Sequence, residues 1–163
     1  MELYIHIPFC MKKCEYCDFL SMVSGEKDRQ TYVDALCREI AYYGKMHGTE
    51  RIDTIYIGGG TPSVVGADAL IRLLECVKEK FYVNPLAEVT IELNPATIEK
   101  DGLHKLREKI CVIIPFVERF YVFYAIVAQL VERHLAKVET AGSSPVYRSG
   151  SLINAGYTWL SIQ

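Results

Sequence analysis

Strand-like and helix-like segments alternate along the first two thirds of this 163-residue chain. β-branched and aromatic residues predict short strands at Leu3–Ile7, Thr54–Ile57 and Val89–Leu93. After each of them, apolar side chains recur at steps of three and four residues, which predicts helices over Lys27–Met46, Leu70–Val77 and Leu103–Ile110. This alternation is typical of an α/β fold with a parallel sheet.

Three motifs follow the predicted strands. The first motif is a C-x3-C-x2-C run directly after the first strand. The second motif, Ile-Gly-Gly-Gly-Thr-Pro-Ser, begins at the end of the second strand and runs to Ser63. The third motif, Thr-Ile-Glu-Leu-Asn-Pro, covers the end of the third strand and runs to Pro95. Because functional residues of such sheets collect at the carboxyl ends of the strands, the three motifs are expected to converge. The sequence therefore predicts one site at this edge of the sheet.

The first motif places Cys10, Cys14 and Cys17 in one short loop. Three thiolates can hold three irons of a [4Fe–4S] cluster and leave the fourth iron open to a ligand. Zinc is the alternative, with His6 nearby, although structural zinc sites usually need a second ligand pair that does not follow downstream.

Disulfides are not expected. The start of the chain lacks the basic and apolar regions of a signal peptide, which predicts a reducing, cytoplasmic environment. The remaining cysteines lie in apolar surroundings and are interpreted as small buried hydrophobic residues rather than ligands. They are Cys37, Cys76 and Cys111.

Taken together, Tyr4–Cys10 with Cys14–Phe19, Ile57–Ser63 and Thr90–Pro95 resemble the motifs of the radical S-adenosylmethionine (SAM) superfamily. The resemblance implies the N-terminal part of a partial TIM-type (β/α)6 barrel, truncated after about three units. It also implies a [4Fe–4S] cluster on the three cysteines and SAM on the open iron, where one electron from the cluster cleaves the sulfonium.

The same resemblance implies which residues bind SAM. They are Tyr4, Tyr16, Gly59, Gly60, Thr61 and Glu92. The glycines let the backbone approach a ligand closely, with an ordinary strand-to-helix turn as the alternative. Glu92 lies among apolar strand residues, so its carboxylate needs a partner. Core packing is the alternative for Tyr4, and His6 is expected to support the site rather than to bind metal.

The residues Cys17-Asp18-Phe19 resemble the HemW-like haem chaperones of this superfamily, because the oxygen-independent coproporphyrinogen III oxidases place a further cysteine two residues after the third. This implies binding and delivery of haem or a porphyrin. The oxidase is the alternative function, and a non-functional or zinc-binding fragment is the third. Whether the protein is an enzyme stays open.

Residues 110–163 are predicted to be a tail outside the family pattern, which covers residues 1–109. Three segments resemble translated arms of a transfer RNA gene, which predicts a frameshift or read-through. They are Val127–Arg133, His134–Val138 and Gly142–Pro145. Such a tail is not expected to pack against the first 109 residues, so its apolar run should form an isolated helix or stay poorly ordered.

Two classes of partner are not expected. The net charge of -2 gives no reason to predict nucleic acid. The segment Ile110–Val131 is long and apolar, but Pro115, Glu118 and Arg119 interrupt it, and each charged residue in a bilayer costs roughly 2.5–3.5 kcal/mol on insertion scales. A membrane span is therefore not predicted.

Overall fold

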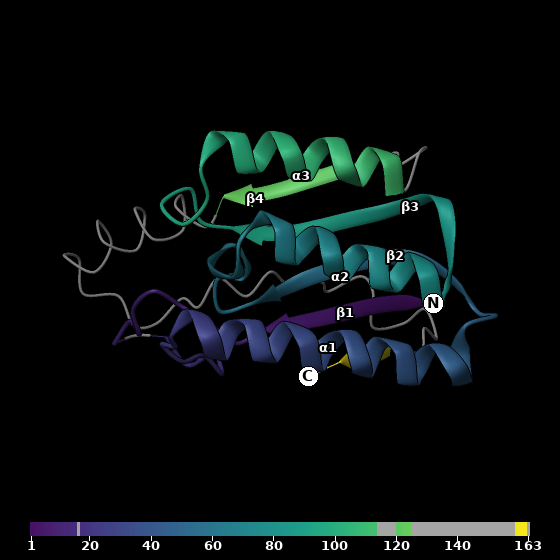
Figure 1. The fold of residues 1–163 in the computed structure, drawn as a ribbon, viewed down its shortest axis with the longest axis horizontal. Helices are drawn as coiled ribbons and strands as arrows, with labels where there is room; N and C mark the ends of the chain where they lie inside the picture. Colours follow the sequence, from purple (N-terminus) through teal and green to yellow (C-terminus); the bar gives the residue numbers. More distant parts are fainter. Residues whose placement is uncertain (16, 114–119, 125–158, 163) are drawn as a thin grey trace, which may run out of the picture.

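The computed structural model describes residues 1–15, 17–113, 120–124 and 159–162. Three strand–helix units follow one another and two further strands complete the described part (Figure 1). The elements are β1 (Glu2–Ile7), α1 (Glu26–His47), β2 (Arg51–Gly59), the 3-10 helix η1 (Pro62–Val65), α2 (Ala67–Lys80), β3 (Tyr82–Leu93), α3 (Lys100–Ile113), β4 (Phe120–Tyr124) and β5 (Trp159–Ile162).

The predicted α/β alternation is confirmed, and β3 is the element whose length was most underestimated. It begins at Tyr82 rather than Val89, because parallel pairing with β2 continues to Arg51↔Tyr82 across a register shift between Ile52 and Thr54. Asn84 and Pro85 disfavour a strand locally, so pairing with a neighbour rather than intrinsic propensity extends it.

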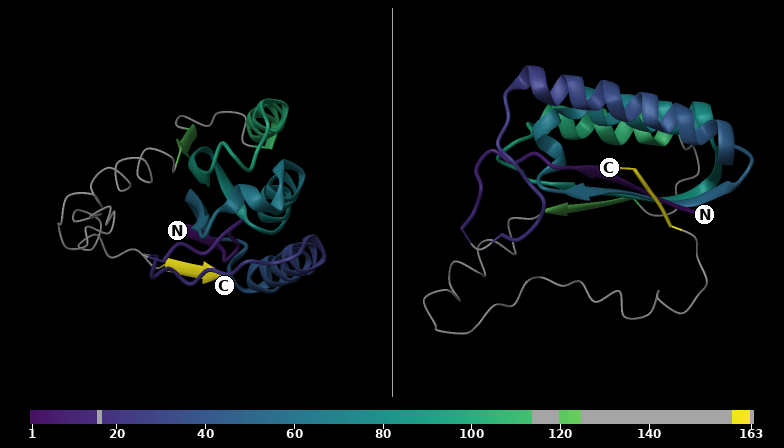
Figure 2. Two further views of the ribbon diagram at one scale, coloured as in Figure 1. Left: turned by 90° about the vertical axis from the view of Figure 1, so that its left-hand side faces the viewer. Right: turned by 90° about the horizontal axis from the view of Figure 1, so that it is seen from below.

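The sheet has the order β4-β3-β2-β1-β5, and all four neighbouring pairs are parallel. Helices α1, α2 and α3 all lie on one face of it (Figure 2). One helical layer outside one parallel sheet is the arrangement of a β/α barrel wall, in which the opposite face of the sheet points inward.

The core lies between the sheet and the helices. Along β1 the side chains alternate, with Leu3, Ile5 and Ile7 buried beneath the helices. Leu36 of α1 and Leu74 of α2 are equally buried in the same cluster. Because side chains of a strand alternate between faces, the residues between the buried ones point to the helix-free face. That face carries the polar residues of the site.

The described parts of the tail belong to the sheet. Phe120–Tyr124 pairs in parallel with Val89–Leu93, and Trp159–Ile162 pairs with Glu2–Ile5. The expectation that the tail does not pack against the first 109 residues is therefore wrong for these strands. A sheet edge presents unpaired N–H and C=O groups, and aromatic and β-branched segments readily pair with it.

The boundary at residue 109 stays a prediction, and α3 runs across it to Ile113. The segments that resemble transfer RNA arms, within residues 127–145, lie outside the described residues. Among the helices that the structure describes, none combines the length and the hydrophobicity needed to cross a bilayer.

Candidate functional site

The first two motifs are hydrogen-bonded to each other at the carboxyl ends of the strands. β1 and β2 pair in register up to Ile7↔Gly59. Beyond this pair, the Gly60 amide donates to the carbonyl oxygen of Ile7 at 2.9 Å, and the Thr61 amide donates to that of Phe9 at 2.7 Å. The backbone therefore links the glycine run directly to the segment that leads into the cysteine loop.

Backbone contacts hold the two ends of the cysteine loop together. Phe9 and Met22 form a parallel bridge, the Cys10 amide donates to the Met22 carbonyl oxygen at 2.9 Å, and the Met22 amide donates to that of Pro8 at 2.7 Å. Inside the loop, the Lys13 ammonium donates to the Phe19 carbonyl oxygen at 2.7 Å. These bonds hold the loop without using any thiol.

The three loop cysteines are free and partly buried. Within the described ranges no group of three or more His, Cys, Asp or Glu side chains is gathered as a metal site, so the thiols share one loop but do not surround one point. Tyr16 lies outside the described residues. Cysteine thiolates are nevertheless the ligands that hold [4Fe–4S] clusters, and three of them would leave one iron open.

Cys10 connects this loop to the glycine run. The Thr61 hydroxyl donates to the Cys10 sulfur at 3.6 Å. A Cβ atom at Gly60 would lie 2.9 Å from the same sulfur and 2.7 Å from the Phe9 carbonyl oxygen. Only a residue without a side chain can lie this close to Cys10 and Phe9, so the arrangement fits a cluster held beside the glycine run.

Gly59 is required by conformation as well as by space. Its φ of +122° is a conformation that side chains rarely adopt, and a Cβ atom there would lie 2.7 Å from the His6 ring. The backbone of the run is thus packed against β1 and shaped by it.

Glu92 has the partners that its position in the strand demands. One carboxylate oxygen accepts from the Tyr56 hydroxyl at 2.5 Å, and the other accepts from the Gly59 amide at 3.1 Å. Glu92 therefore ties the end of β3 to β2 at the glycine run. Each carboxylate oxygen has a further lone pair with which it can accept from a ligand.

Tyr4 and His6 continue the polar face along β1. The Tyr4 hydroxyl and His6 Nδ1 lie 2.8 Å apart, and His6 Nε2 lies 3.2 Å from the Leu20 carbonyl oxygen. Because a carbonyl only accepts, the tautomer that satisfies both contacts carries its hydrogen on Nε2 and accepts from Tyr4 at Nδ1. Burial, and then the charge of Glu92, raises the pKa of Tyr4, which keeps the hydroxyl protonated as a donor.

Sequence reasoning missed Tyr56, whose ring centroid lies 5.9 Å from that of Tyr4. The signal was available in the alternation of β2, since Tyr56 lies between the buried residues Ile55 and Ile57 and so points to the helix-free face. Tyr4, Tyr56 and Glu92 thereby form one polar surface beside the glycine run.

Ser63 was also missed as a site-building residue. It is fully buried, its hydroxyl accepts from the Asn94 amide at 2.9 Å, and it lies 2.5 Å from the Thr97 hydroxyl. Thr97 in turn donates to the Asn94 carbonyl oxygen at 2.8 Å, so Ser63 must donate to Thr97. This closed ring of three hydrogen bonds joins the second motif to the third.

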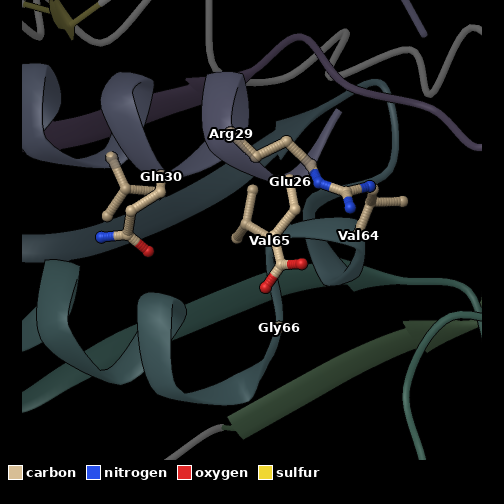
Figure 3. A pocket seen from close by; sticks show the side chains of 7 residues that line it. Glu26, Arg29, Gln30, Val64, Val65 and Gly66 are labelled. Carbon is tan, nitrogen blue, oxygen red and sulfur yellow. The ribbon is translucent and has the colours of Figure 1, made fainter. Parts of the chain in front are cut away.

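A hollow of about 240 Å³ lies between the start of α1 and η1 (Figure 3). Its lining includes Glu26, Arg29 and Val64, and Figure 3 shows the Arg29 guanidinium extending toward Val64. None of the lining residues belongs to the polar face around Glu92. The hollow is therefore separate from the candidate site.

Comparisons with known proteins point the same way as the motifs. Residues 4–117 match the model of the Radical SAM superfamily. The heme chaperone HemW of Escherichia coli is 40% identical over 102 residues, which cover 62% of this chain and 27% of that protein. HemW of Buchnera aphidicola from Schizaphis graminum is 38% identical over 100 residues, covering 61% and 27%.

The oxygen-independent coproporphyrinogen III oxidase of Salmonella typhimurium is 35% identical over 108 residues, covering 66% of this chain and 24% of that protein. Among solved structures, coproporphyrinogen III oxidase (HemN) from Escherichia coli, described as a radical SAM enzyme, superposes with a TM-score of 0.64 at 33% identity. The superposition covers 81% of this chain and 30% of that one. The chain thus spans about a quarter of the length of the curated relatives it matches.

Proposed function

The chain belongs to the radical SAM superfamily, and from this we propose that it is a HemW-like protein that binds a [4Fe–4S] cluster, SAM and haem. One observation carries the proposal. The segment that leads into the loop with the three cysteines is joined by backbone hydrogen bonds to the glycine run, and the lack of a side chain at Gly60 lets the Cys10 sulfur lie against that run. A cluster and a ligand on its open iron need such a pair of adjacent segments.

We assign the cluster to Cys10, Cys14 and Cys17, within residues 1–109. When bound, the cluster supplies the electron that cleaves SAM reductively. The protein orients the loop. The bridge between Phe9 and Met22 closes it, and the Thr61 hydroxyl donates to the Cys10 sulfur. Zinc on the same thiols is the alternative that metal analysis separates.

We assign SAM to the helix-free face beside the loop. Gly59, Gly60 and Thr61 would face its methionyl end, with Tyr4 and Tyr16 as further contacts. Glu92 would act in two ways. Its charge favours a cationic group nearby, and its hydrogen bond to the Gly59 amide holds the glycine run in place.

Haem is the second ligand of the proposal, with the coproporphyrinogen III oxidase as the second candidate function. By the resemblance, Phe19 stands where the oxidases carry a further cysteine, and HemW relatives match at 38–41% identity against 35% for the oxidases. Both observations favour the chaperone.

The test is anaerobic reconstitution of the full chain followed by iron, sulfide and zinc analysis. We expect about four irons and matching sulfide per chain. Haem titration followed by absorbance should then show saturable binding, while coproporphyrinogen incubated with SAM and a reductant should not be consumed. Zinc without sulfide would contradict the cluster, and coproporphyrinogen consumption would favour the oxidase.

A further inference from the structure

Two cysteines outside the candidate site lie against each other between two adjacent helices. Cys37 of α1 and Cys76 of α2 are both free and partly buried. Their sulfur atoms lie 3.0 Å apart, with the Cys76 thiol donating to the Cys37 sulfur. The interpretation from sequence, that these are separate small core residues, does not anticipate this contact.

The packing of the two helices holds the thiols together. α1 and α2 run side by side on the same face of the sheet (Figures 1 and 2). About one turn before the cysteines, Arg72 of α2 pairs with Asp34 of α1 at 2.5 Å. Leu36 and Val77, the sequence neighbours of the two cysteines, are buried in the common core. An ion pair and core contacts thus set the register in which the sulfurs meet.

We propose that Cys37 and Cys76 are a thiol–disulfide modification site that closes into an intramolecular disulfide under a small-molecule disulfide oxidant. A disulfide bond is about 2.05 Å long, so the sulfurs need to approach by only about 1 Å. Side-chain rotation changes the distance between two sulfur atoms on adjacent helices, so an approach of this size is within reach of the two partly buried side chains.

The reaction balances with glutathione disulfide as the oxidant. The Cys76 thiolate attacks one sulfur of the oxidant, forms a mixed disulfide and releases one glutathione. The Cys37 sulfur then attacks the Cys76 sulfur and displaces the second glutathione, and the departing glutathione sulfur takes up the proton that Cys37 loses. Two protein thiols are oxidised and one glutathione disulfide is reduced to two thiols.

Geometry and charge favour this order of attack. Burial, and then the neighbouring Cys76 thiol, raises the pKa of Cys37 to about 12, so Cys37 remains protonated at neutral pH. Cys37 is therefore not the thiol that attacks the oxidant first, and it loses its proton only as it attacks the mixed disulfide on the adjacent Cys76. Arg72 lies one turn before Cys76 on the same helix and supplies a positive charge near both sulfurs.

The crosslink would fasten the helices that support β1 and β2, leaving the cysteine loop and the glycine run untouched. It closes a loop between α1 and α2, which restricts the unfolded chain and should raise the unfolding midpoint. The proposal does not depend on the cluster or on SAM, because neither thiol belongs to the candidate site.

The experiment treats the full chain with glutathione disulfide, blocks remaining thiols by alkylation, and maps tryptic peptides by mass spectrometry without reduction. Cleavage at Lys and Arg isolates Cys37 in residues 30–38 and Cys76 in residues 73–78. We expect these two peptides to appear linked, in apo and cluster-loaded protein alike. The oxidised chain should also unfold at a higher temperature than the reduced chain.

Cys37→Ser and Cys76→Ser are the matched controls, and in both the linked peptide and the temperature shift should be absent. Stable glutathionylation of Cys76 without the link would overturn the proposal. So would alkylation of both thiols after oxidation, or a link that joins either of them to the cysteine loop instead. Because the wild-type chain itself reports the link, a variant that folds poorly does not obscure the result.

Discussion

Gly60→Ala tests whether the glycine run and the cysteine loop are packed as one unit. The added Cβ atom would lie 2.7 Å from the Phe9 carbonyl oxygen and 2.9 Å from the Cys10 sulfur. The Phe9 oxygen cannot move away freely, because it accepts from the Thr61 amide at 2.7 Å. The variant should therefore displace the cysteine loop rather than a flexible side chain.

The expected loss of unfolding free energy in Gly60→Ala follows from these contacts of the added Cβ atom. Inserting a methyl group into a well-packed place costs about 1–3 kcal/mol, and contacts with backbone atoms point to the upper half of that range. Replacing glycine by alanine also restricts the unfolded chain, which stabilises the folded state by about 0.4–1 kcal/mol. The unfolding free energy should fall by about 1–2.6 kcal/mol in total, and iron content after reconstitution should fall with it.

Chemical denaturation and iron analysis measure the two effects, and Gly25→Ala is the control. At Gly25 the nearest atom to an added Cβ is a carboxylate oxygen of Asp28 at 3.8 Å, an ordinary contact. That variant should keep its iron and lose less than about 1 kcal/mol, as expected for a helix N-cap. A Gly60→Ala chain with wild-type stability and full iron content would refute the packing described.

Three further predictions address other contacts. Alanine at any one of the loop cysteines should abolish cluster loading, while alanine at Cys37 or Cys76 should leave the iron content unchanged. The loop cysteines are Cys10, Cys14 and Cys17. Ser63→Ala should lower the unfolding free energy by about 1–3 kcal/mol, because it leaves a buried amide unpaired, and Thr97→Ser, which keeps its hydroxyl, should lower it less. Burial raises the pKa of Tyr32 to about 12, so the unfolding free energy should decrease as pH rises from about 10 to 12, and Tyr32→Phe should flatten that decrease.

Each of these has a result that would contradict it. Iron loss of equal size in the Cys37 variant would remove the cysteine loop as the cluster site. A Thr97→Ser chain as unstable as Ser63→Ala would show that the ring of hydrogen bonds through Ser63, Asn94 and Thr97 is not what stabilises the contact between the second and third motifs. An unchanged pH profile in Tyr32→Phe would mean that burial does not raise the pKa of Tyr32.

The positions of the motifs relative to the elements could be predicted because they depend on local pattern. Alternation with period two marks Leu3–Ile7 as a half-buried strand, and steps of three and four mark Lys27–Met46 as a helix. Both elements appear within one residue of the predicted bounds. The spacing of the cysteines likewise places three thiols on one loop whatever the rest of the chain does.

Contacts between distant residues could not be predicted in this way. The bonds from Tyr56 and Gly59 to Glu92 depend on the register of β2 against β3, and the ring through Ser63 depends on two loops 31 residues apart. The Cys37–Cys76 contact requires two helices to pack at one particular register. No local periodicity encodes such a register.

The sequence by itself thus determined the α/β alternation, the thiol donor set and the strand ends at which the motifs lie, because these follow from covalent spacing and side-chain periodicity. Tertiary structure alone decided which groups pair. It set the partners of Glu92, the direction of the Tyr4–His6 hydrogen bond and the pairing of Phe120–Tyr124 with a neighbouring strand. That last segment was expected to lie apart, yet it pairs with β3, because an open sheet edge offers backbone hydrogen bonds to any chain that can extend along it.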